Sequence, residues 1–140
     1  MRVMVLVKAS AESERGILPT TDEFAAMGAF NEALASAGVL LVGEGLKPSA
    51  AGKRVRFEGE ARSVEDGPFG ATEELVAGFW LWQVSSMDEA VAWARRCPNP
   101  MPGGGVLELR PLYEMEDFGA EFTPELRERE ERLRIELEGT

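Results

Sequence analysis

The order in which strand-like and helix-like segments follow one another limits this chain to a small set of folds. Residues 2–8 form a continuous apolar run rich in β-branched side chains, which is typical of a strand in the middle of a sheet. An amphipathic helix is predicted next. It begins after Thr20, because Glu23 completes a capping box, and Gly38 ends it. The chain therefore starts with a strand and a helix.

The rest of the chain continues this alternation. A second helix is predicted after Ser86, where Glu89 gives another capping-box pattern. Strand-like segments lie on both sides of it, at residues 39–46, 53–58, 61–65, 79–84 and 106–110. This order predicts an α+β protein, a ferredoxin-like βαβ(ββ)αβ sandwich with its helices on one face of a mainly antiparallel sheet. A second copy of the chain is expected to cover the other face, which makes the protein a homodimer.

Residues 114–140 differ from the rest in charge. They carry 10 acidic and 4 basic side chains, against 15 and 11 in residues 1–113, and so hold more than half of the net charge of −10. We therefore expect one domain over residues 1–113 and an acidic extension over 114–140. A helix is predicted at about residues 124–137, because Thr123 and Pro124 are typical of a helix start. Its apolar stripe consists of Leu126, Leu133 and Leu137.

The chain has no histidine and one cysteine, Cys97. A Ser-His-Asp triad, a histidine general base and a zinc site of His and Cys ligands are therefore excluded within it, and we expect no metal and no cofactor. The acidic balance disfavours direct binding to nucleic acid. No apolar run has the ~20 residues that span a membrane. A single thiol agrees with a reducing compartment, so a cytoplasmic protein is expected.

Five short blocks occur in an order that resembles one family. They are Gly43-Glu44-Gly45-Leu46-Lys47-Pro48, Asp66-Gly67-Pro68-Phe69, Gly78-Phe79-Trp80, Glu89-Ala90 with Trp93-Ala94, and Glu108-Leu109-Arg110-Pro111. In this order they resemble the YciI-related proteins of the D-G-P-F type, and the resemblance covers residues 1 to about 113. It implies a dimeric α/β barrel built from two ferredoxin-like subunits.

The chain departs from this family at two places where chemistry is expected. Members often follow the D-G-P-F element with Glu-Thr-Lys-Glu, where this chain has Ala71-Thr72-Glu73-Glu74. Many members carry a histidine just before the last strand, where this chain has Gly103-Gly104-Gly105. The resemblance therefore implies the fold and the dimer, but no histidine-based active site. Related domains accompany sigma factors, which implies a role in transcription by association alone.

Two carboxylates are the candidate acid–base residues, Glu44 and Asp66. Glu44 lies between two glycines, where an inward carboxylate would have a raised pKa; alternatively it is a charge on an edge strand. Asp66 and Phe69 either stand at the mouth of a cleft, or cap a turn and fill the core. Trp80 either lines an aromatic pocket or packs with Trp82 inside the dimer. The candidate ligand-binding residues are thus Asp66, Phe69, Glu44 and Trp80.

These features favour a homodimeric module that binds a small molecule or assists another protein. The alternative is an enzyme that uses Glu44 or Asp66 as acid and base on a small organic substrate, such as an aromatic one.

Overall fold

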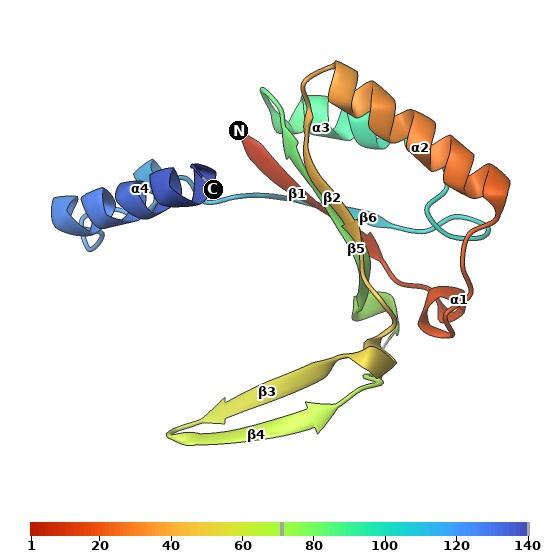
Figure 1. The fold of residues 1–140 in the computed structure, drawn as a ribbon, viewed down its shortest axis with the longest axis horizontal. Helices are drawn as coiled ribbons and strands as arrows, with labels where there is room; N and C mark the ends of the chain where they lie inside the picture. Colours follow the sequence, from red (N-terminus) through yellow and green to blue (C-terminus); the bar gives the residue numbers. More distant parts are fainter. Residues whose placement is uncertain (71, 140) are drawn as a thin grey trace.

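Two separate sheets and four α-helices make up the part of the chain that the computed structural model describes, residues 1–70 and 72–139 (Figure 1). The strands are β1 (Arg2–Lys8), β2 (Leu40–Gly45), β3 (Lys53–Glu58), β4 (Ala61–Asp66), β5 (Val76–Gln83) and β6 (Leu107–Pro111). The helices are α1 (Ala11–Glu14), α2 (Thr21–Ser36), α3 (Met87–Ala94) and α4 (Pro124–Glu138), with short 3₁₀ turns at Ser49–Ala51, Thr72–Glu74 and Met115–Asp117.

The larger sheet has the strand order β2-β5-β1-β6, and every pair of neighbours is antiparallel. Helix α2 connects β1 to β2 across β5, and α3 connects β5 to β6 across β1. Each helix thus joins two strands that are separated by one other strand, which is the ferredoxin-like arrangement. The predicted α+β class and the ferredoxin-like fold of the chain are confirmed.

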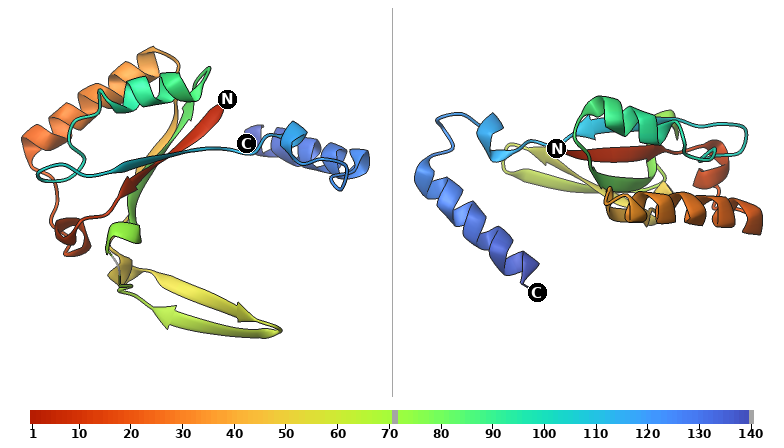
Figure 2. Two further views of the ribbon diagram at one scale, coloured as in Figure 1. Left: turned by 180° about the vertical axis from the view of Figure 1, so that it is seen from behind. Right: turned by 90° about the horizontal axis from the view of Figure 1, so that it is seen from above.

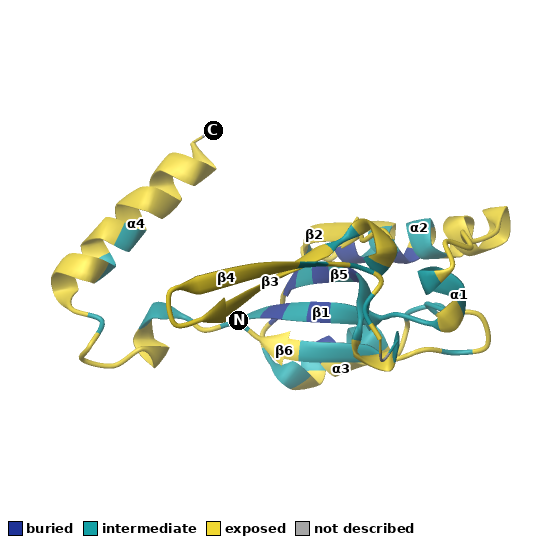
Figure 3. Ribbon diagram, turned by 90° about the horizontal axis from the view of Figure 1, so that it is seen from below, coloured by how far each residue is buried: buried dark blue, intermediate teal, exposed yellow. Residues whose placement is uncertain are grey.

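The core lies between this sheet and the two helices that cover it. Because side chains alternate along a strand, Val3 and Val5 of β1 share a face with Trp80 and Trp82 of β5, and all four are buried (Figure 3). Phe30 of α2 meets both indole rings edge-on, with centroid distances of 5.9 and 6.3 Å. The two tryptophans therefore fill the core of one subunit rather than the space between two subunits.

The β3–β4 hairpin forms a sheet of its own and projects from one end of the larger sheet (Figures 1 and 3). The sequence predicts these strands but not their separation. Arg54 and Arg56 alternate with Val55 and Phe57, so one face of the hairpin is polar and the other carries a few apolar side chains. Two strands have no second layer to cover that small apolar face, so the hairpin cannot form a core of its own. Val55 and Phe57 are accordingly exposed.

Two short segments differ from the sequence prediction. Residues 9–19, which lie between the first predicted strand and the first predicted helix, contain α1, because Ser10 and Ser13 exchange the hydrogen bonds of a capping box. Val76 and Ala77, which precede the strand predicted at residues 79–84, extend β5 at its start. Val76 pairs with Lys8 of β1, and the Ala77 carbonyl accepts from the Leu46 amide. Strand pairing therefore decides the local structure here.

Helix α4 lies apart from the core. It begins after Thr123, whose hydroxyl accepts from the Leu126 amide, as predicted, and none of its described residues is buried. Figures 1 and 2 show α4 and the β3–β4 hairpin projecting from opposite ends of the larger sheet, on the side away from α2 and α3. Among the helices described, none is both long and apolar enough to cross a membrane.

Candidate functional site

The face of the larger sheet that α2 and α3 leave uncovered is the candidate site, called here the open face. Its centre is apolar and consists of Met4 and Leu6 of β1, Phe79 and Leu81 of β5, and Val42 of β2. These residues alternate with the buried core residues, and so point to the opposite side of the sheet. None of the five is buried within the chain, and Val42 is 41% exposed.

Two carboxylates stand at the ends of one row across the open face. Strand pairing places Glu44 beside Phe79, Phe79 beside Leu6, and Leu6 beside Glu108. Strands lie about 4.8 Å apart, so the backbones of Glu44 and Glu108 are about 14 Å from each other. At that separation the two groups flank an apolar strip rather than share a proton. Arg110 lies next to this row and pairs with Glu108 at 3.4 Å.

The glycines beside Glu44 explain why its side chain points to the open face. A Cβ at Gly43 would lie 2.8 Å from Cδ1 of Trp80, so only glycine fits against that indole. Gly45 pairs with Gly78 on the same, helix-covered side. Trp80 is buried there and donates from Nε1 to Oδ1 of Asn31 at 2.9 Å. Glu44 and Trp80 therefore lie on opposite sides of the sheet, and one ligand cannot contact both side chains.

Asp66 lies on the separate hairpin. It ends β4, its side chain is 77% exposed, and it forms an ion pair with Lys53, its cross-strand partner. In the part of the chain that the structure describes, no hydrogen bond or ion pair joins Asp66 to Glu44. The two candidate acid–base residues are therefore not brought together within the chain.

The D-G-P-F segment, residues 66–69, packs against the 3₁₀ turn at Ser49–Ala51. The Phe69 amide donates to Oγ of Ser49 at 3.1 Å, and the Ser49 amide and hydroxyl both donate to the carboxylate of Glu14. The Arg54 guanidinium lies 4.0 Å from the centre of the Phe69 ring. These contacts link α1, the turn and the hairpin. Sequence reasoning missed Glu14 and Ser49, because no local spacing signals a contact across 35 residues.

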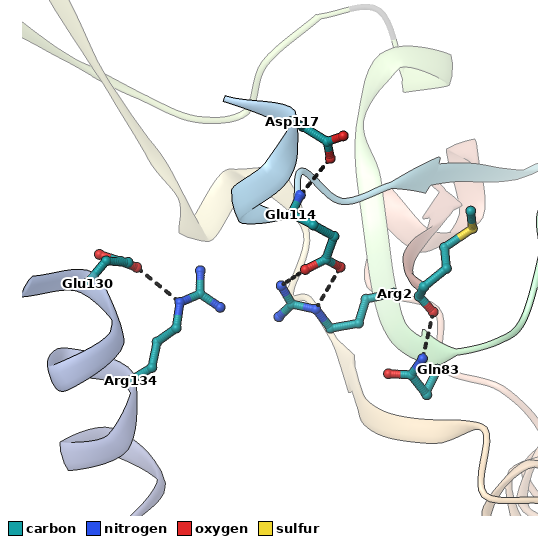
Figure 4. A network of polar contacts seen from close by, with 7 residues as sticks. Arg2, Gln83, Glu114, Asp117, Glu130 and Arg134 are labelled. Carbon is teal, nitrogen blue, oxygen red and sulfur yellow. Dashed lines mark hydrogen bonds and ion pairs between the residues drawn. The ribbon is translucent and has the colours of Figure 1, made fainter. Parts of the chain in front are cut away.

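A second polar cluster joins the start of β1 to the segment before α4 (Figure 4). Arg2 donates two hydrogen bonds to the Glu114 carboxylate, at 3.1 and 3.3 Å, and the Glu114 amide donates to Oδ2 of Asp117. The bond from Arg2 holds the pKa of Glu114 below its ordinary value, and the nearby charge of Arg134 in α4 adds to that effect. Figure 4 shows Arg134 pointing toward this pair while it binds Glu130.

Two wide surface depressions lie at the two ends of β6. One, of about 1090 Å³, is lined by residues that include Arg2, Gln83, Arg110 and Tyr113. The other, of about 510 Å³, is lined by residues that include Lys8, Met101 and Glu108. Each thus includes one charged residue of β6 that borders the open face. Within residues 1–70 and 72–139, no cluster of His, Cys, Asp or Glu is placed to hold a metal ion.

Cys97 is set apart from these features. It follows α3 and packs against the core, and burial raises the pKa of its thiol to about 11. The thiol is therefore protonated at neutral pH, and a nucleophilic role does not fit it.

Comparisons with known proteins identify related chains. The family model of the YCII-related domain matches residues 1–116. An uncharacterised protein of Rhizobium meliloti (strain 1021) is 40% identical over 67 residues, which are 48% of this chain and 54% of that protein. The chain thus spans about half the length of this curated relative.

A solved structure also resembles the chain. It is the 5-chloro-2-hydroxyhydroquinone dehydrochlorinase of Burkholderia phenoliruptrix AC1100, in complex with 2,5-dihydroxybenzoquinone. The two chains are 15% identical with a TM-score of 0.48, and the match covers 84% of this chain and 98% of the other. A likeness of this degree does not bear on what this chain binds or converts.

Proposed function

Because this chain belongs to the family of YCII-related domains, we propose that it is a homodimeric module that binds a small organic molecule between two open sheet faces. The membership itself confirms the family that the five sequence blocks indicate. The dimer and the ligand are our proposal, and the uncovered apolar face of the sheet is the observation that carries it.

The open face has the composition of an interface. Met4, Leu6, Phe79 and Leu81 form a continuous apolar centre that the chain's own helices leave uncovered. A patch of this kind marks an interaction site in a protein that is not embedded in lipid. A second copy supplies an identical apolar face, and two-fold dimers are the commonest assemblies of this sort.

A second subunit also supports ligand binding. Ligand sites bury most of the surface of the molecule that they hold, whereas both depressions beside β6 are open to solvent. A partner laid over the open face encloses the space above it. That space is bordered by the Phe79 ring, by Glu44 and Glu108, and by Arg110. These groups suit a small molecule with a flat apolar part and polar ends.

The proposed dimer is tested by placing a charge on the open face. We expect the wild-type chain to sediment as a dimer at micromolar concentration and Leu81→Glu to sediment as a monomer, because a carboxylate in an apolar interface costs several kcal/mol. Val91→Glu is the matched control, since Val91 is 43% exposed on α3, in the other layer. It should leave the dimer intact. A wild-type monomer at tens of micromolar would contradict the proposal.

The proposed ligand contact is tested at Glu44. Compounds found by ligand-observed NMR on the wild-type dimer should bind Glu44→Gln at least tenfold more weakly, because a charge-assisted bond is lost. Asp66→Asn, on the hairpin, should bind them as the wild type does.

The alternative function, an enzyme, makes a separate prediction for the same two variants. The observation that favours it is the position of Glu44, a carboxylate beside an apolar strip that a partner would shield from water. If a compound is turned over, Glu44→Gln should abolish the turnover. Turnover that survives in both Glu44→Gln and Asp66→Asn excludes either residue as the acid–base group.

A further inference from the structure

We infer that α4 is an arm that holds the dimer together. Its leucine face, formed by Leu126, Leu133 and Leu137, packs on the β2 edge of the partner subunit. This inference rests on the proposed homodimer and extends it beyond the family domain, because the family model ends at residue 116 and α4 begins at Pro124.

Helix α4 needs a surface that its own subunit does not provide. It has 15 residues and none of those described is buried (Figure 3). In proteins most of the stability of a helix comes from packing of its apolar face, and at 15 residues an isolated helix in water is only at the limit of stability. Leu126 and Leu133 lie two turns apart on one face and are 42% and 49% exposed. Their face is adjacent to that of Arg134, the residue that points toward the body of the chain.

The surface area of the subunit supports an extensive interface. A compact protein of 15.3 kDa exposes about 7,100 Å². This chain exposes 9943 Å². The excess is much larger than the roughly 800 Å² that each partner buries in an interface of standard size. Helix α4 and the β3–β4 hairpin both contribute to this excess area, and both lie on the side of the open face (Figures 1 and 2). A partner subunit that covers the open face therefore comes close to α4.

Strand register shows which part of the partner is near α4. Leu40, Trp82, Val3 and Pro111 form one row across the sheet, so the start of β2 and the end of β6 lie at the same end. If the two-fold axis runs along the strands, the β2 edge of one subunit lies over the β6 edge of the other. If the axis runs across the strands, β2 lies over β2.

Charge favours the first arrangement. With the axis along the strands, each residue stays in its row, so Glu44 lies over Glu108 of the partner subunit. The charge of Glu108 is already paired with Arg110, one row away, so Glu44 meets an ion pair. With the axis across the strands and through this row, Glu44 faces its own copy with no such cation beside it, and like charges repel in an interface. The first arrangement also brings the end of β6, which leads into α4, next to the start of β2 in the partner.

The start of β2 is a surface that needs cover. β2 is an edge strand, and Leu41 is the extra residue where its pairing with β5 is irregular. Leu41 and Val42 are 48% and 41% exposed. An exposed apolar edge strand tends to associate with other chains, and proteins often cover it with a helix. The leucine face of the partner's α4 supplies such a cover.

The test is a double-mutant cycle in the full-length chain, with the dimer dissociation constant measured by dilution and sedimentation. Leu133→Ala and Leu41→Ala should each raise the dissociation constant about tenfold, and the double variant should raise it by less than the product of the two. Ile135→Ala is the matched control, because Ile135 lies on the opposite face of α4 and is 68% exposed. It should change the constant less than twofold. Alanine is a strong helix former, so circular dichroism should show α4 unchanged.

The other outcomes separate this inference from the homodimer itself. If Leu133→Ala leaves the dissociation constant unchanged while Leu81→Glu still gives monomers, the homodimer stands and α4 is not a dimerisation arm. If the effects of Leu133→Ala and Leu41→Ala simply multiply, α4 does not dock on the β2 edge. If the wild-type chain is monomeric, the homodimer fails first, and the inference fails with it.

Discussion

Gly67 shows how one residue of the D-G-P-F segment acts through packing. A Cβ at this position would lie 1.7 Å from the carbonyl oxygen of Ser49, a distance that no backbone adjustment of a few tenths of an ångström relieves. The close approach lets the Phe69 amide reach the Ser49 hydroxyl, which in turn holds Glu14. Gly67 therefore has a structural role in the D-G-P-F segment. A glycine is required there because the backbone lies against the 3₁₀ turn at Ser49–Ala51.

We expect Gly67→Ala to lower the free energy of unfolding by about 3 kcal/mol, because the methyl group forces the loop away from the 3₁₀ turn. Gly70→Ala is the matched control, since a Cβ at Gly70 meets nothing within 4 Å. It should change stability by no more than about 0.5 kcal/mol. Urea denaturation of both variants measures the difference. Equal stability of the two would show that the loop does not need the close approach.

At the scale of elements, the cluster around Glu114 connects β1 with the segment that leads to α4. Arg2 is the first residue of β1, and its side chain and that of Glu114 are 26% and 35% exposed. Stacked Tyr113 and Phe118, with centroids 5.1 Å apart, continue the link toward α4. The segment is therefore held by one ion pair and a few ring contacts, while the core elements are held by burial.

This ion pair predicts a specific dependence on pH. The pKa of Glu114 is lowered in the folded protein by Arg2, so its contribution to stability is present above the ordinary pKa of about 4.5 and is lost as the pH falls through the lowered folded value. Relative to Glu114→Gln, the wild type should be more stable by up to about 1 kcal/mol at pH 7, because the pair is partly exposed. The difference should shrink below pH 4.5.

Urea denaturation at pH 7, 5 and 3.5 measures this difference. Glu121→Gln, in the same segment, is the control and should show a much smaller dependence on pH. A difference between wild type and Glu114→Gln that stays constant down to pH 3.5 would mean that the ion pair does not contribute to folding.

At the scale of the whole molecule, the open face, the β3–β4 hairpin and α4 together explain the proposed dimer. All three expose apolar side chains, and all three lie on the side of the larger sheet that α2 and α3 leave uncovered (Figure 1). The predicted loss of dimer in Leu81→Glu and the weakening in Leu133→Ala both follow from this arrangement. Neither residue would stand out if the subunit were viewed as a complete globule.

The sequence by itself determined the secondary structure of the larger sheet and its two helices, apart from the first residues of β5. Apolar periodicity and caps such as Thr20 act within a few residues of one another, so they can be read directly. The same holds for the alternation at Gly43, Glu44 and Gly45, which assigns Glu44 to the face opposite the glycines. The family also follows from short blocks in a fixed order.

Only the tertiary structure decided how distant segments meet. It separated the hairpin from the larger sheet, buried Trp80 under the helices, and placed Asp66 beside Lys53 away from Glu44. It also joined Glu14 to Ser49 and set α4 apart from the core. Each of these depends on contacts between residues that are far apart in the chain. Such contacts leave no periodic pattern in the sequence, because they are selected by packing of the whole subunit.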